Sequence, residues 1–438
     1  MAQRDGKTQG EAKMKLTINP VKSLVGILRP PSDKSLTHRA FMFASFASSE
    51  SIVRKPLQGE DCENTLRAMI RLGLRHEMLG PEELRLIPTQ QWMQPNGPID
   101  CGNSGTTMRL LAGLVAARPL SVTFVGDASL SKRPMGRIAT PLRLMGAQIE
   151  GDRAPLTVHG GSLKGVDYVS PVASAQVKSC TLLAGLMASG TTSVSEPALS
   201  RDHTERMLQA MGYAVNREGL KVSVQGGQQG RGFEFKVPGD ISSAAFFIVA
   251  SALLPNSRLE VTELSVNPTR TGLLDVLTQC QIPYGVYDVS EELGEPVGSL
   301  VVETAKSPQP FVIEDDLVPR LIDEIPVLAV LATQCHGTSI IRNANELRVK
   351  ESDRIELVAD GLRRMGANVE TFEDGMAITG PTTLTAAKIH AQGDHRIAMA
   401  FAVAGLIATG TTEIEGADSI RTSFPKFEEE LERLCCIG

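Results

Sequence analysis

The sequence lacks most features of exported, membrane-bound or disulfide-stabilised proteins. Its 7 cysteines are scattered, and no CxxC or Cys/His metal spacing occurs, so neither a disulfide framework nor a zinc site is expected. No apolar run approaches the roughly 18 residues of a membrane span. The N-terminal segment MAQRDGKTQGEAKMK lacks the apolar stretch of a secretory signal. We therefore expect a cytoplasmic protein with reduced thiols and no membrane partner.

Aromatic residues and excess positive charge are also scarce. Aromatic side chains make up 4% of the chain, and the formal net charge is −6. A nucleic-acid partner would favour a basic surface and aromatic stacking platforms, so we expect none. The sequence lacks the GxSxG motif of Ser-His-Asp hydrolases and the GxxxxGK[ST] loop of nucleotide phosphoryl transferases, which disfavours both classes.

What the sequence does contain is a sixfold repeat of a capping residue, an apolar helical stretch, a break and a short strand. The copies begin about 70 residues apart, at Ser32, Asn103, Ser174, Asp240, Asp323 and Asp394. A second, more amphipathic helix follows each copy and often ends in Met-Gly or Leu-Gly, a helix C-cap signal. Because the first helices are apolar nearly all round, we expect them to be buried, with sheets outside them.

The length and the repeats predict two domains of three repeats each. At roughly 100–200 residues per domain, two is the simplest division of the 438 residues. The Pro30-Pro31 pair and the segment FKVPGD, residues 235 to 240, are the expected crossing points. We expect one domain over residues 32–238. The other covers residues 239–438 and is completed by residues 1–31, which are too few to form a domain.

Basic and hydroxyl side chains stand at the starts of the predicted helices. Free N–H groups and the helix dipole at these positions favour anions, so six similar copies would line an interdomain cleft suited to a small polyanion. The plainer interpretation of residues 350–354 is a solvated helix start. Asp323 and Glu324 are equally interpretable as caps, although a carboxylate facing a cationic cleft is a candidate base. His395, taken alone, is more often structural.

Seven motifs together resemble the 5-enolpyruvylshikimate-3-phosphate synthase family. They are DKSLTHR, GNSGTTMR, DASLSKRPMGR, SAQVKS, SRDHTE, LRVKESDR and GDHRIAM, and the resemblance runs from Lys15 to the C-terminus. It implies a two-domain, inside-out α/β barrel built from six βαβαββ repeats, three per domain. The helices are buried, the sheets lie outside, and the active site is the interdomain cleft.

The resemblance also implies a reaction. The enolpyruvyl group of phosphoenolpyruvate is transferred to the 5-hydroxyl of shikimate 3-phosphate by addition and elimination through a tetrahedral intermediate, releasing phosphate, in aromatic amino acid biosynthesis. It implies no cofactor, no metal and no covalent enzyme intermediate. We expect these two small molecules as the only partners, and a monomer. Their two phosphates and two carboxylates suit fork-shaped arginine donors.

The family's functional residues carry over by position. The shikimate 3-phosphate contacts are Lys34, Ser35, Arg39, Ser174, Ala175, Gln176, Arg201, Asp323 and Lys350. The phosphoenolpyruvate contacts are Lys34, Asn103, Gly105, Thr106, Arg133, Gln176, Arg354 and Arg396. The catalytic residues are Asp323 as general base, Glu351 for proton transfer at the methylene carbon, and Lys34 as proton donor or electrostatic stabiliser. The division of acid and base roles among these three stays open.

The sequence departs from the family pattern near the C-terminus. Many members carry a Lys before a TFP-like motif, whereas IRTSFPKF places Thr422 there, with Arg421 and Lys426 as alternative cations. The SAQVKS and SRDHTE forms are typical of the family's second class, some members of which tolerate glyphosate. Tolerance often accompanies Ala where this chain has Gly105, so we expect a glyphosate-sensitive enzyme unless Leu110 reshapes the pocket.

Two alternatives remain. The sister enolpyruvyl transferase acting on UDP-N-acetylglucosamine usually has a Cys before an Arg-Pro pair, near the place of Ala128 here. A non-catalytic, polyanion-binding repeat protein would not need Asp323 or Glu351 to face the cations. We further expect like-charged loops to repel across the empty cleft and substrate anions to draw the domains together.

Overall fold

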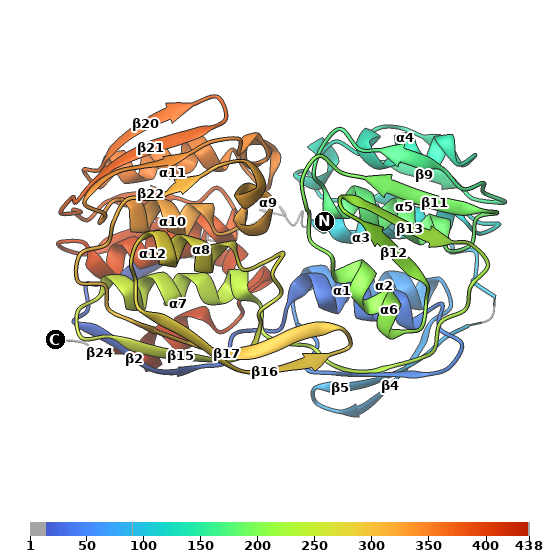
Figure 1. The fold of residues 1–438 in the computed structure, drawn as a ribbon, viewed down its shortest axis with the longest axis horizontal. Coiled ribbons are helices and arrows are strands. Elements are labelled where there is room, and N and C mark those ends of the chain that lie inside the picture. The colour runs from blue at the N-terminus through green and yellow to red at the C-terminus, as the bar shows by residue number, and fades with distance from the viewer. Residues whose placement is uncertain (1–14, 90, 437–438) are drawn as a thin grey trace, which may run out of the picture.

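The computed structural model describes residues 15–89 and 91–436, which form two lobes side by side (Figure 1). Residues 1–14 and 437–438, which belong to the predicted second domain, lie outside the described residues. Six buried helices form the centres of the lobes. They are α1 (Lys34–Ala44), α3 (Gly105–Ala116) and α5 (Ala175–Gly185) in the first lobe, and α7 (Ile241–Leu253), α10 (Ile325–Ala332) and α12 (His395–Ile407) in the second.

The remaining helices lie farther out and are shorter or more amphipathic. In the first lobe they are α2 (Glu60–Arg71), α4 (Gly136–Leu144) and α6 (His203–Ala210); in the second they are α8 (Gly272–Gln279), α9 (Val318–Leu321), α11 (Arg354–Arg364) and α13 (Phe427–Leu434). Four 3-10 turns are η1 (Leu130–Lys132), η2 (Asp315–Leu317), η3 (Asn345–Val349) and η4 (Ala417–Thr422). Several of these outer elements bring cleft side chains into place.

Three sheets cover the helices of the first lobe. Their strand orders are β14 (Glu234–Lys236), β3 (Ser51–Arg54), β5 (Glu83–Ile87), β4 (Arg75–Gly80); β6 (Ile99–Asp100), β7 (Ser121–Val125), β9 (Leu156–His159), β8 (Gln148–Glu150); and β10 (Asp167–Val169), β11 (Thr191–Ser195), β13 (Lys221–Gln225), β12 (Val215–Glu218). In each, one parallel pair is followed by two antiparallel pairs, which is the pattern of a βαβαββ repeat.

Three further sheets cover the second lobe. Their orders are β16 (Tyr284–Glu292), β17 (Glu295–Glu303), β15 (Arg258–Ser265), β2 (Ser23–Leu28), β24 (Cys435–Cys436); β18 (Val312–Ile313), β19 (Gly337–Ile341), β21 (Gly375–Gly380), β20 (Asn368–Phe372); and β1 (Lys15–Ile18), β23 (Thr412–Glu415), β22 (Lys388–His390). The predicted α/β fold with buried helices and outer sheets is confirmed. The described strands form six separate sheets rather than one continuous barrel wall.

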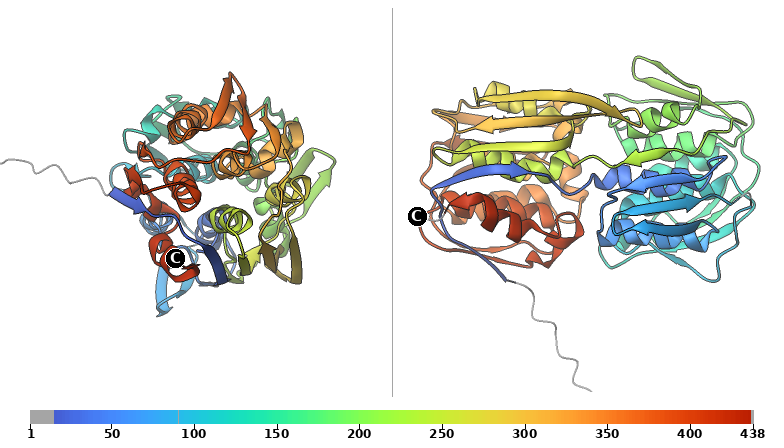
Figure 2. Two further views of the ribbon diagram at one scale, coloured as in Figure 1. Left: turned by 90° about the vertical axis from the view of Figure 1, so that its left-hand side faces the viewer. Right: turned by 90° about the horizontal axis from the view of Figure 1, so that it is seen from below.

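The strand that precedes α1 and the strand that precedes α7 each belong to a sheet of the other lobe. Strand β2 pairs in parallel with β15 of the second lobe, and the chain then crosses into α1 of the first. Strand β14 pairs in parallel with β3 of the first lobe, and the chain crosses back into α7. The crossing segments lie side by side, joined by a bridge between Ser32 and Gly239 (Figure 2). The lobes are therefore tied by two adjacent connections that form a natural hinge.

Each lobe has its own hydrophobic core. One cluster runs from Leu36 to Val237, and the other joins residues from Ile241 to Leu434 with Leu16, Ile18, Leu24 and Leu28. This grouping is consistent with the expected boundaries after residues 31 and 238, which stay a prediction. Helices α3 and α5 approach closely at Gly113, where a Cβ would lie 2.3 Å from the Cys180 carbonyl oxygen.

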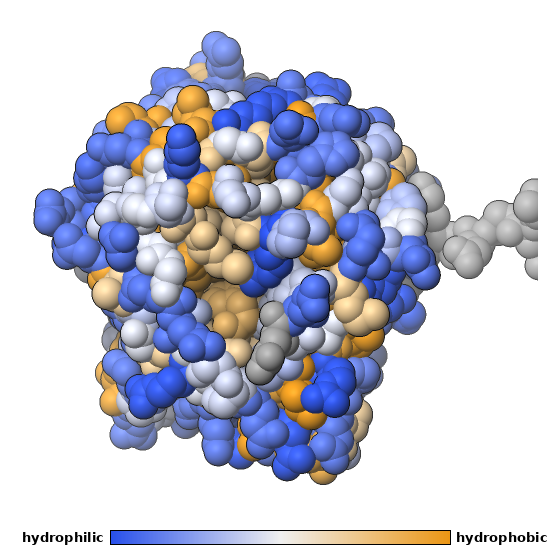
Figure 3. Space-filling model, turned by 90° about the vertical axis from the view of Figure 1, so that its right-hand side faces the viewer, coloured by the Kyte–Doolittle hydropathy of each residue, from blue (hydrophilic) through white to orange (hydrophobic). Residues whose placement is uncertain are grey.

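The outer end of the first lobe is mostly hydrophilic, with apolar residues gathered near its centre (Figure 3). Over residues 15–89 and 91–436, no helix is long and apolar enough to cross a membrane. A hollow lined by many charged side chains lies between the lobes.

Candidate functional site

A cavity of about 570 Å³ lies between the two lobes. All the predicted site residues except Arg39 line it: Lys34, Ser35, Asn103, Gly105, Thr106, Arg133, Ser174, Ala175, Gln176, Arg201, Asp323, Lys350, Glu351, Arg354 and Arg396. They come from both halves of the chain and from helix starts far apart in the sequence. The fold thus brings them together at the junction between the lobes.

Helix caps determine how these side chains reach the cavity. Asp33 caps α1 by accepting a hydrogen bond from Leu36 N at 2.8 Å, which places Lys34 as the first helical residue. Ser104 and Ser174 cap α3 and α5 in the same way. Because the first N–H groups of each helix have no intrahelical partner, each capped start presents donors and a positive dipole end to the cavity.

Glu351 lies between two arginines from different lobes. Its Oε2 accepts from Arg354 Nη2 at 2.6 Å, and its Oε1 lies 3.5 Å from Arg133 Nη1. Burial alone would raise the pKa of Glu351, but Arg354 and Arg133 hold that pKa well below its usual range. Arg354 is itself anchored by Asp394, which accepts from Arg354 Nε at 2.9 Å. In the empty site Glu351 is therefore ionised.

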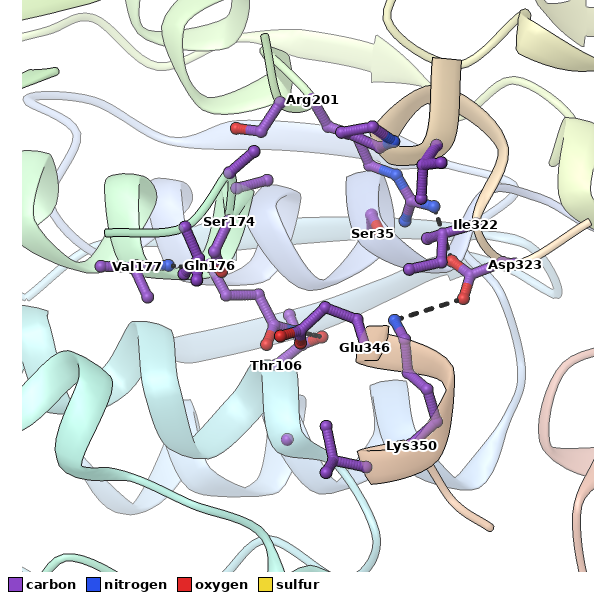
Figure 4. A pocket seen from close by; sticks show the side chains of 18 of the residues that line it. Ser35, Thr106, Ser174, Gln176, Val177, Arg201, Ile322, Asp323, Glu346 and Lys350 are labelled. Atoms are coloured by element: carbon purple, nitrogen blue, oxygen red, sulfur yellow. Dashed lines mark hydrogen bonds and ion pairs between the residues drawn. The ribbon is translucent and has the colours of Figure 1, made fainter. Parts of the chain in front are cut away.

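Asp323 is also surrounded by cations from both lobes. Arg201 Nη2 donates to Asp323 Oδ2 at 2.6 Å, and Lys350 Nζ lies 3.5 Å from Oδ1, on the other side of the carboxylate (Figure 4). Burial opposes ionisation, yet Lys350 and Arg201 hold the pKa of Asp323 well below its usual range. The neighbouring Glu324 points elsewhere: it is fully buried, does not line the cavity, and accepts a hydrogen bond from Ser242 Oγ.

Lys34 carries a positive charge in the cavity. Its Nζ lies 3.1 Å from Asp61 Oδ2. Burial would lower the pKa of Lys34, but the carboxylates of Asp61 and Glu351 outweigh burial and raise it. A lysine with a raised pKa is a weak proton donor and a strong electrostatic stabiliser at neutral pH.

A chain of hydrogen bonds fixes the amide of Gln176. Arg109 Nη1 donates to Gln176 Oε1 at 2.5 Å, while Gln176 Nε2 donates to Thr106 Oγ1 at 3.0 Å. A Cβ on Gly105 would lie 2.9 Å from Arg109 Nη1. Burial, with Arg133 close by, lowers the pKa of Arg109 to about 10, so Arg109 remains charged at neutral pH.

Some expected cations lie elsewhere. Arg39 is buried beneath the cavity, where it donates to Thr204 Oγ1 at 2.8 Å and to Ser179 Oγ at 3.1 Å. Lys178 of the SAQVKS motif is buried and does not line the cavity. Neither do Thr422, Arg421 or Lys426, so none of them supplies the missing C-terminal contact in this structure.

The sequence reasoning missed six charged residues that line the cavity: Asp61, Arg109, Arg137, Asp315, Asp316 and Glu346. Arg109 and Arg137 close the motifs GNSGTTMR and DASLSKRPMGR, and their place inside these motifs was the available signal. Asp61 and Glu346 are acids, and no motif marked them. Glu346 accepts from Arg137 Nη1 at 2.7 Å across the cleft. The cavity therefore holds cations with matched carboxylates rather than cations alone.

The arrangement suits a substrate with several negative charges. Two clusters of arginine or lysine surround the carboxylates of Asp323 and Glu351, and such donors suit anionic groups. Within the described part of the chain, no group of three or more His, Cys, Asp or Glu side chains has the geometry of a metal site.

A family model, curated relatives and a solved structure all place the chain near the same enzyme family. The family model described as EPSP synthase (3-phosphoshikimate 1-carboxyvinyltransferase) matches residues 18–431. A protein of Bacillus cereus (strain AH187) named 3-phosphoshikimate 1-carboxyvinyltransferase is 46% identical over 424 residues, covering 95% of this chain and 99% of the relative. A relative of the same name from Bacillus thuringiensis subsp. konkukian (strain 97-27) is also 46% identical, with the same coverage. A solved EPSP synthase from Acinetobacter baumannii has a TM-score of 0.87 and 42% identity, covering 97% of this chain and 98% of that one.

Proposed function

The chain belongs to the EPSP synthase (3-phosphoshikimate 1-carboxyvinyltransferase) family, and from this premise we propose how its cleft performs the reaction. The enzyme transfers the enolpyruvyl group of phosphoenolpyruvate to shikimate 3-phosphate in the shikimate pathway. The acceptor atom is the 5-hydroxyl oxygen, and phosphate leaves from a tetrahedral intermediate. The observation that carries this proposal is the convergence of cations and two carboxylates in one cavity between the lobes.

Phosphoenolpyruvate binds in the cluster around Glu351. Arg133, Arg354 and Arg396 hold its phosphate and carboxylate, and Lys34 lies between this substrate and the next. Asn103, Gly105, Thr106 and Gln176 complete the subsite. Arg133 is oriented for this task because its Nη2 donates to Asn103 Oδ1 at 2.6 Å. Preoriented donors stabilise the extra negative charge of the tetrahedral intermediate without reorganisation.

Shikimate 3-phosphate binds in the cluster around Asp323. Its phosphate lies at the start of α5, with Ser174, Ala175, Gln176 and Arg201, while Lys34, Ser35 and Lys350 bind the remainder. Arg39 supports this subsite through its hydrogen bonds to Ser179 and Thr204 and through Ser35, whose carbonyl accepts from Arg39 Nη1 at 2.9 Å.

Asp323 acts as the general base. It is ionised in the empty site and accepts the proton of the 5-hydroxyl as that oxygen attacks the enol carbon. Because Arg201 holds the same carboxylate at 2.6 Å, capture of the substrate phosphate by Arg201 frees an Asp323 oxygen for this proton. Binding of the acceptor thus prepares its own base.

Glu351 transfers protons at the methylene carbon. It must first gain a proton, although it is ionised in the empty site. When the anionic groups of phosphoenolpyruvate occupy Arg133 and Arg354, those arginines no longer neutralise Glu351, so its pKa rises toward the working range. Protonated Glu351 delivers its proton to the methylene carbon in the addition step, and the carboxylate so formed removes a proton from the resulting methyl group in the elimination.

The finer assignments follow the sequence motifs. We assign the chain to the second class of the family on the SAQVKS and SRDHTE forms, and we expect glyphosate sensitivity because Gly105 adds no methyl group beside Arg109. The enzyme acts as a monomer on its two small substrates. The free thiols of Cys62, Cys101, Cys180, Cys280 and Cys335 fit a reducing, cytoplasmic compartment.

A phosphate-release assay tests the function. The purified chain should release phosphate from phosphoenolpyruvate when shikimate 3-phosphate is present and not when UDP-N-acetylglucosamine replaces it. Asp323→Ala should lose turnover by about a thousandfold while retaining most of its affinity for both substrates, since base catalysis typically contributes about 10²–10⁴. Release with UDP-N-acetylglucosamine alone, or no release with either acceptor, contradicts the proposal. Near-normal turnover by Asp323→Ala contradicts only the role of that residue.

A further inference from the structure

Two motifs that typify the second class meet in the core rather than in the cavity. SAQVKS contributes Lys178 of α5, and SRDHTE contributes Glu205 of α6. Lys178 Nζ lies 2.8 Å from Glu205 Oε1, and neither residue lines the cavity. These two side chains have no part in the chemistry described above, so their role must be sought in what they hold.

Lys178 binds a second carboxylate and the loop before α6. Its Nζ lies 2.8 Å from Glu196 Oε2 and donates to the Ser200 carbonyl at 3.3 Å. An ammonium group has three N–H donors, and Lys178 thus finds three acceptors in a place without solvent contact. Each N–H donor of the buried Lys178 ammonium therefore has an acceptor.

Glu196 links this core pair to the cavity wall. Its second oxygen, Oε1, accepts from the backbone N–H of Ser174 at 3.1 Å and from Ser200 Oγ at 2.6 Å. Ser174 opens the phosphate-binding turn, and Ser200 directly precedes Arg201; all three line the cavity. One carboxylate oxygen therefore fixes the distance between two parts of the proposed phosphate subsite, the Ser174 turn and the Ser200–Arg201 arm.

Energetics argue that this arrangement serves more than stability. Desolvating a buried ion pair costs several kcal/mol per ion, and well-packed apolar substitutes are often equally stable. Glu205 has a partner besides Lys178, because it accepts from the half-exposed Arg217 at 2.9 Å. Glu196 is bonded instead to Lys178, Ser174 and Ser200, and the last two line the cavity.

We propose that Glu196, held in place by Lys178, is a positioning residue for the phosphate of shikimate 3-phosphate. It sets the separation between the Ser174 turn and the Ser200–Arg201 arm. This inference rests on the proposed function, since it assigns a task to the acceptor subsite. A misplacement of one arm by about 1 Å is enough to cost a hundredfold in a positioned interaction.

A matched pair of variants tests the role of the Glu196 oxygen. Lys178→Met/Glu196→Gln removes the buried charges but keeps an acceptor for Ser174 and Ser200, whereas Lys178→Met/Glu196→Leu removes the acceptor as well. The readout is the ratio of affinities for shikimate 3-phosphate and shikimate, measured by calorimetry. We expect the ratio to fall at least about tenfold in the Leu variant and to be largely retained in the Gln variant. The KM for phosphoenolpyruvate should stay near the wild-type value.

A structural control separates positioning from stability. Arg118→Met removes another buried cation of the first lobe, one that donates to the Leu114 carbonyl away from the cavity. It should lower the melting temperature and leave the affinity ratio unchanged. A folded Leu variant with the wild-type ratio overturns the inference, as does an Arg118→Met ratio that falls equally. If wild-type protein neither binds shikimate 3-phosphate nor turns over, the proposed function fails instead.

Discussion

At the residue scale, the cavity shows how a protein can keep many cations together without substrate. Four of these cations are balanced by carboxylates: Lys34 by Asp61, Arg201 by Asp323, and Arg133 and Arg354 by Glu351. The proposed catalytic acids are thus the counterions of the empty site. Substrate anions compete for the same arginines, so binding and the activation of the proton-transfer groups are one event.

Two buried histidines give the protein an early response to acid. Burial, followed by the charges of Arg396 and Lys34, lowers the pKa of His395 to about 3; burial with Lys34 and Arg39 lowers the pKa of His38 well below its usual value. Both are neutral when folded and protonate near pH 6.5 when unfolded. Their contribution to stability is full above that pH and is lost as pH falls toward the folded pKa.

We therefore expect the free energy of unfolding to fall between pH 6 and 4.5, by about 1.4 kcal/mol per pH unit for each of these histidines. Urea titrations at several pH values measure the slope. His395→Asn should make it shallower, whereas His76→Asn, on the exposed face of β4, should not. A pH-independent stability over this window would contradict neutral histidines in the fold.

At the element scale, the repeat made most of the architecture predictable. Apolar helical stretches beginning at Ser32, Ser174 or Asp394 can only be satisfied by burial, and the helices that follow are indeed buried. Side-chain orientation was not predictable in the same way. Lys178 and Gln176 stand two residues apart in one motif, yet Gln176 lines the cavity and Lys178 lies in the core.

Long-range partners explain why the rest of the site was missed. Motif position marks where a cation stands, but Asp61 and Glu346 enter the cavity only because α2 and η3 fold against it. Nothing in their local sequence distinguishes them from solvated acids at a helix start. The plainer interpretation of Asp323 and Glu324 as helix caps did not separate them either: Asp323 lines the cavity, whereas Glu324 is buried and accepts a hydrogen bond from Ser242 Oγ.

The start of α3 is where a single methyl group should change specificity. Gly105 is its first residue, and a Cβ there would displace the end of Arg109, which holds Gln176. We expect the wild-type enzyme to be inhibited by glyphosate in competition with phosphoenolpyruvate. Gly105→Ala should raise the inhibition constant by about tenfold or more, with a smaller rise in the KM for phosphoenolpyruvate, since one methyl group is worth about 10–200-fold in a tight pocket.

Inhibition kinetics on both proteins check this expectation, with Gly161→Ala as the control. Gly161 does not line the cavity, and a Cβ there would meet no atom within 4 Å. The expectation is wrong if wild-type enzyme binds glyphosate far more weakly than phosphoenolpyruvate, or if Gly105→Ala leaves the inhibition constant unchanged.

At the scale of the whole molecule, the two lobes are joined by a hinge on one side and by ion pairs across the cleft. Arg133–Glu351, Arg137–Glu346 and Arg201–Asp323 each pair a first-lobe cation with a second-lobe acid. The sequence analysis expected loops of like charge on the two rims. The rims instead carry opposite charges at these three points. Mutual repulsion cannot be what separates the lobes when no substrate is present.

The weakness of the exposed Arg137–Glu346 pair, together with the competition of substrate anions for Arg133 and Arg201, is what makes substrate-driven closure possible. Arg137 and Glu346 have side chains 39% and 40% exposed, and such pairs contribute at most about 1 kcal/mol. A substrate with several charges binds both rims more strongly, so shikimate 3-phosphate should lower the radius of gyration in small-angle scattering, whereas shikimate should lower it less.

High salt and the Glu346→Gln variant should expand the ligand-free form and leave the loaded form unchanged, because screening acts most on the exposed pair. An equal radius with and without shikimate 3-phosphate would show that the three ion pairs already hold the lobes closed, and that substrate exchanges partners within a rigid cleft.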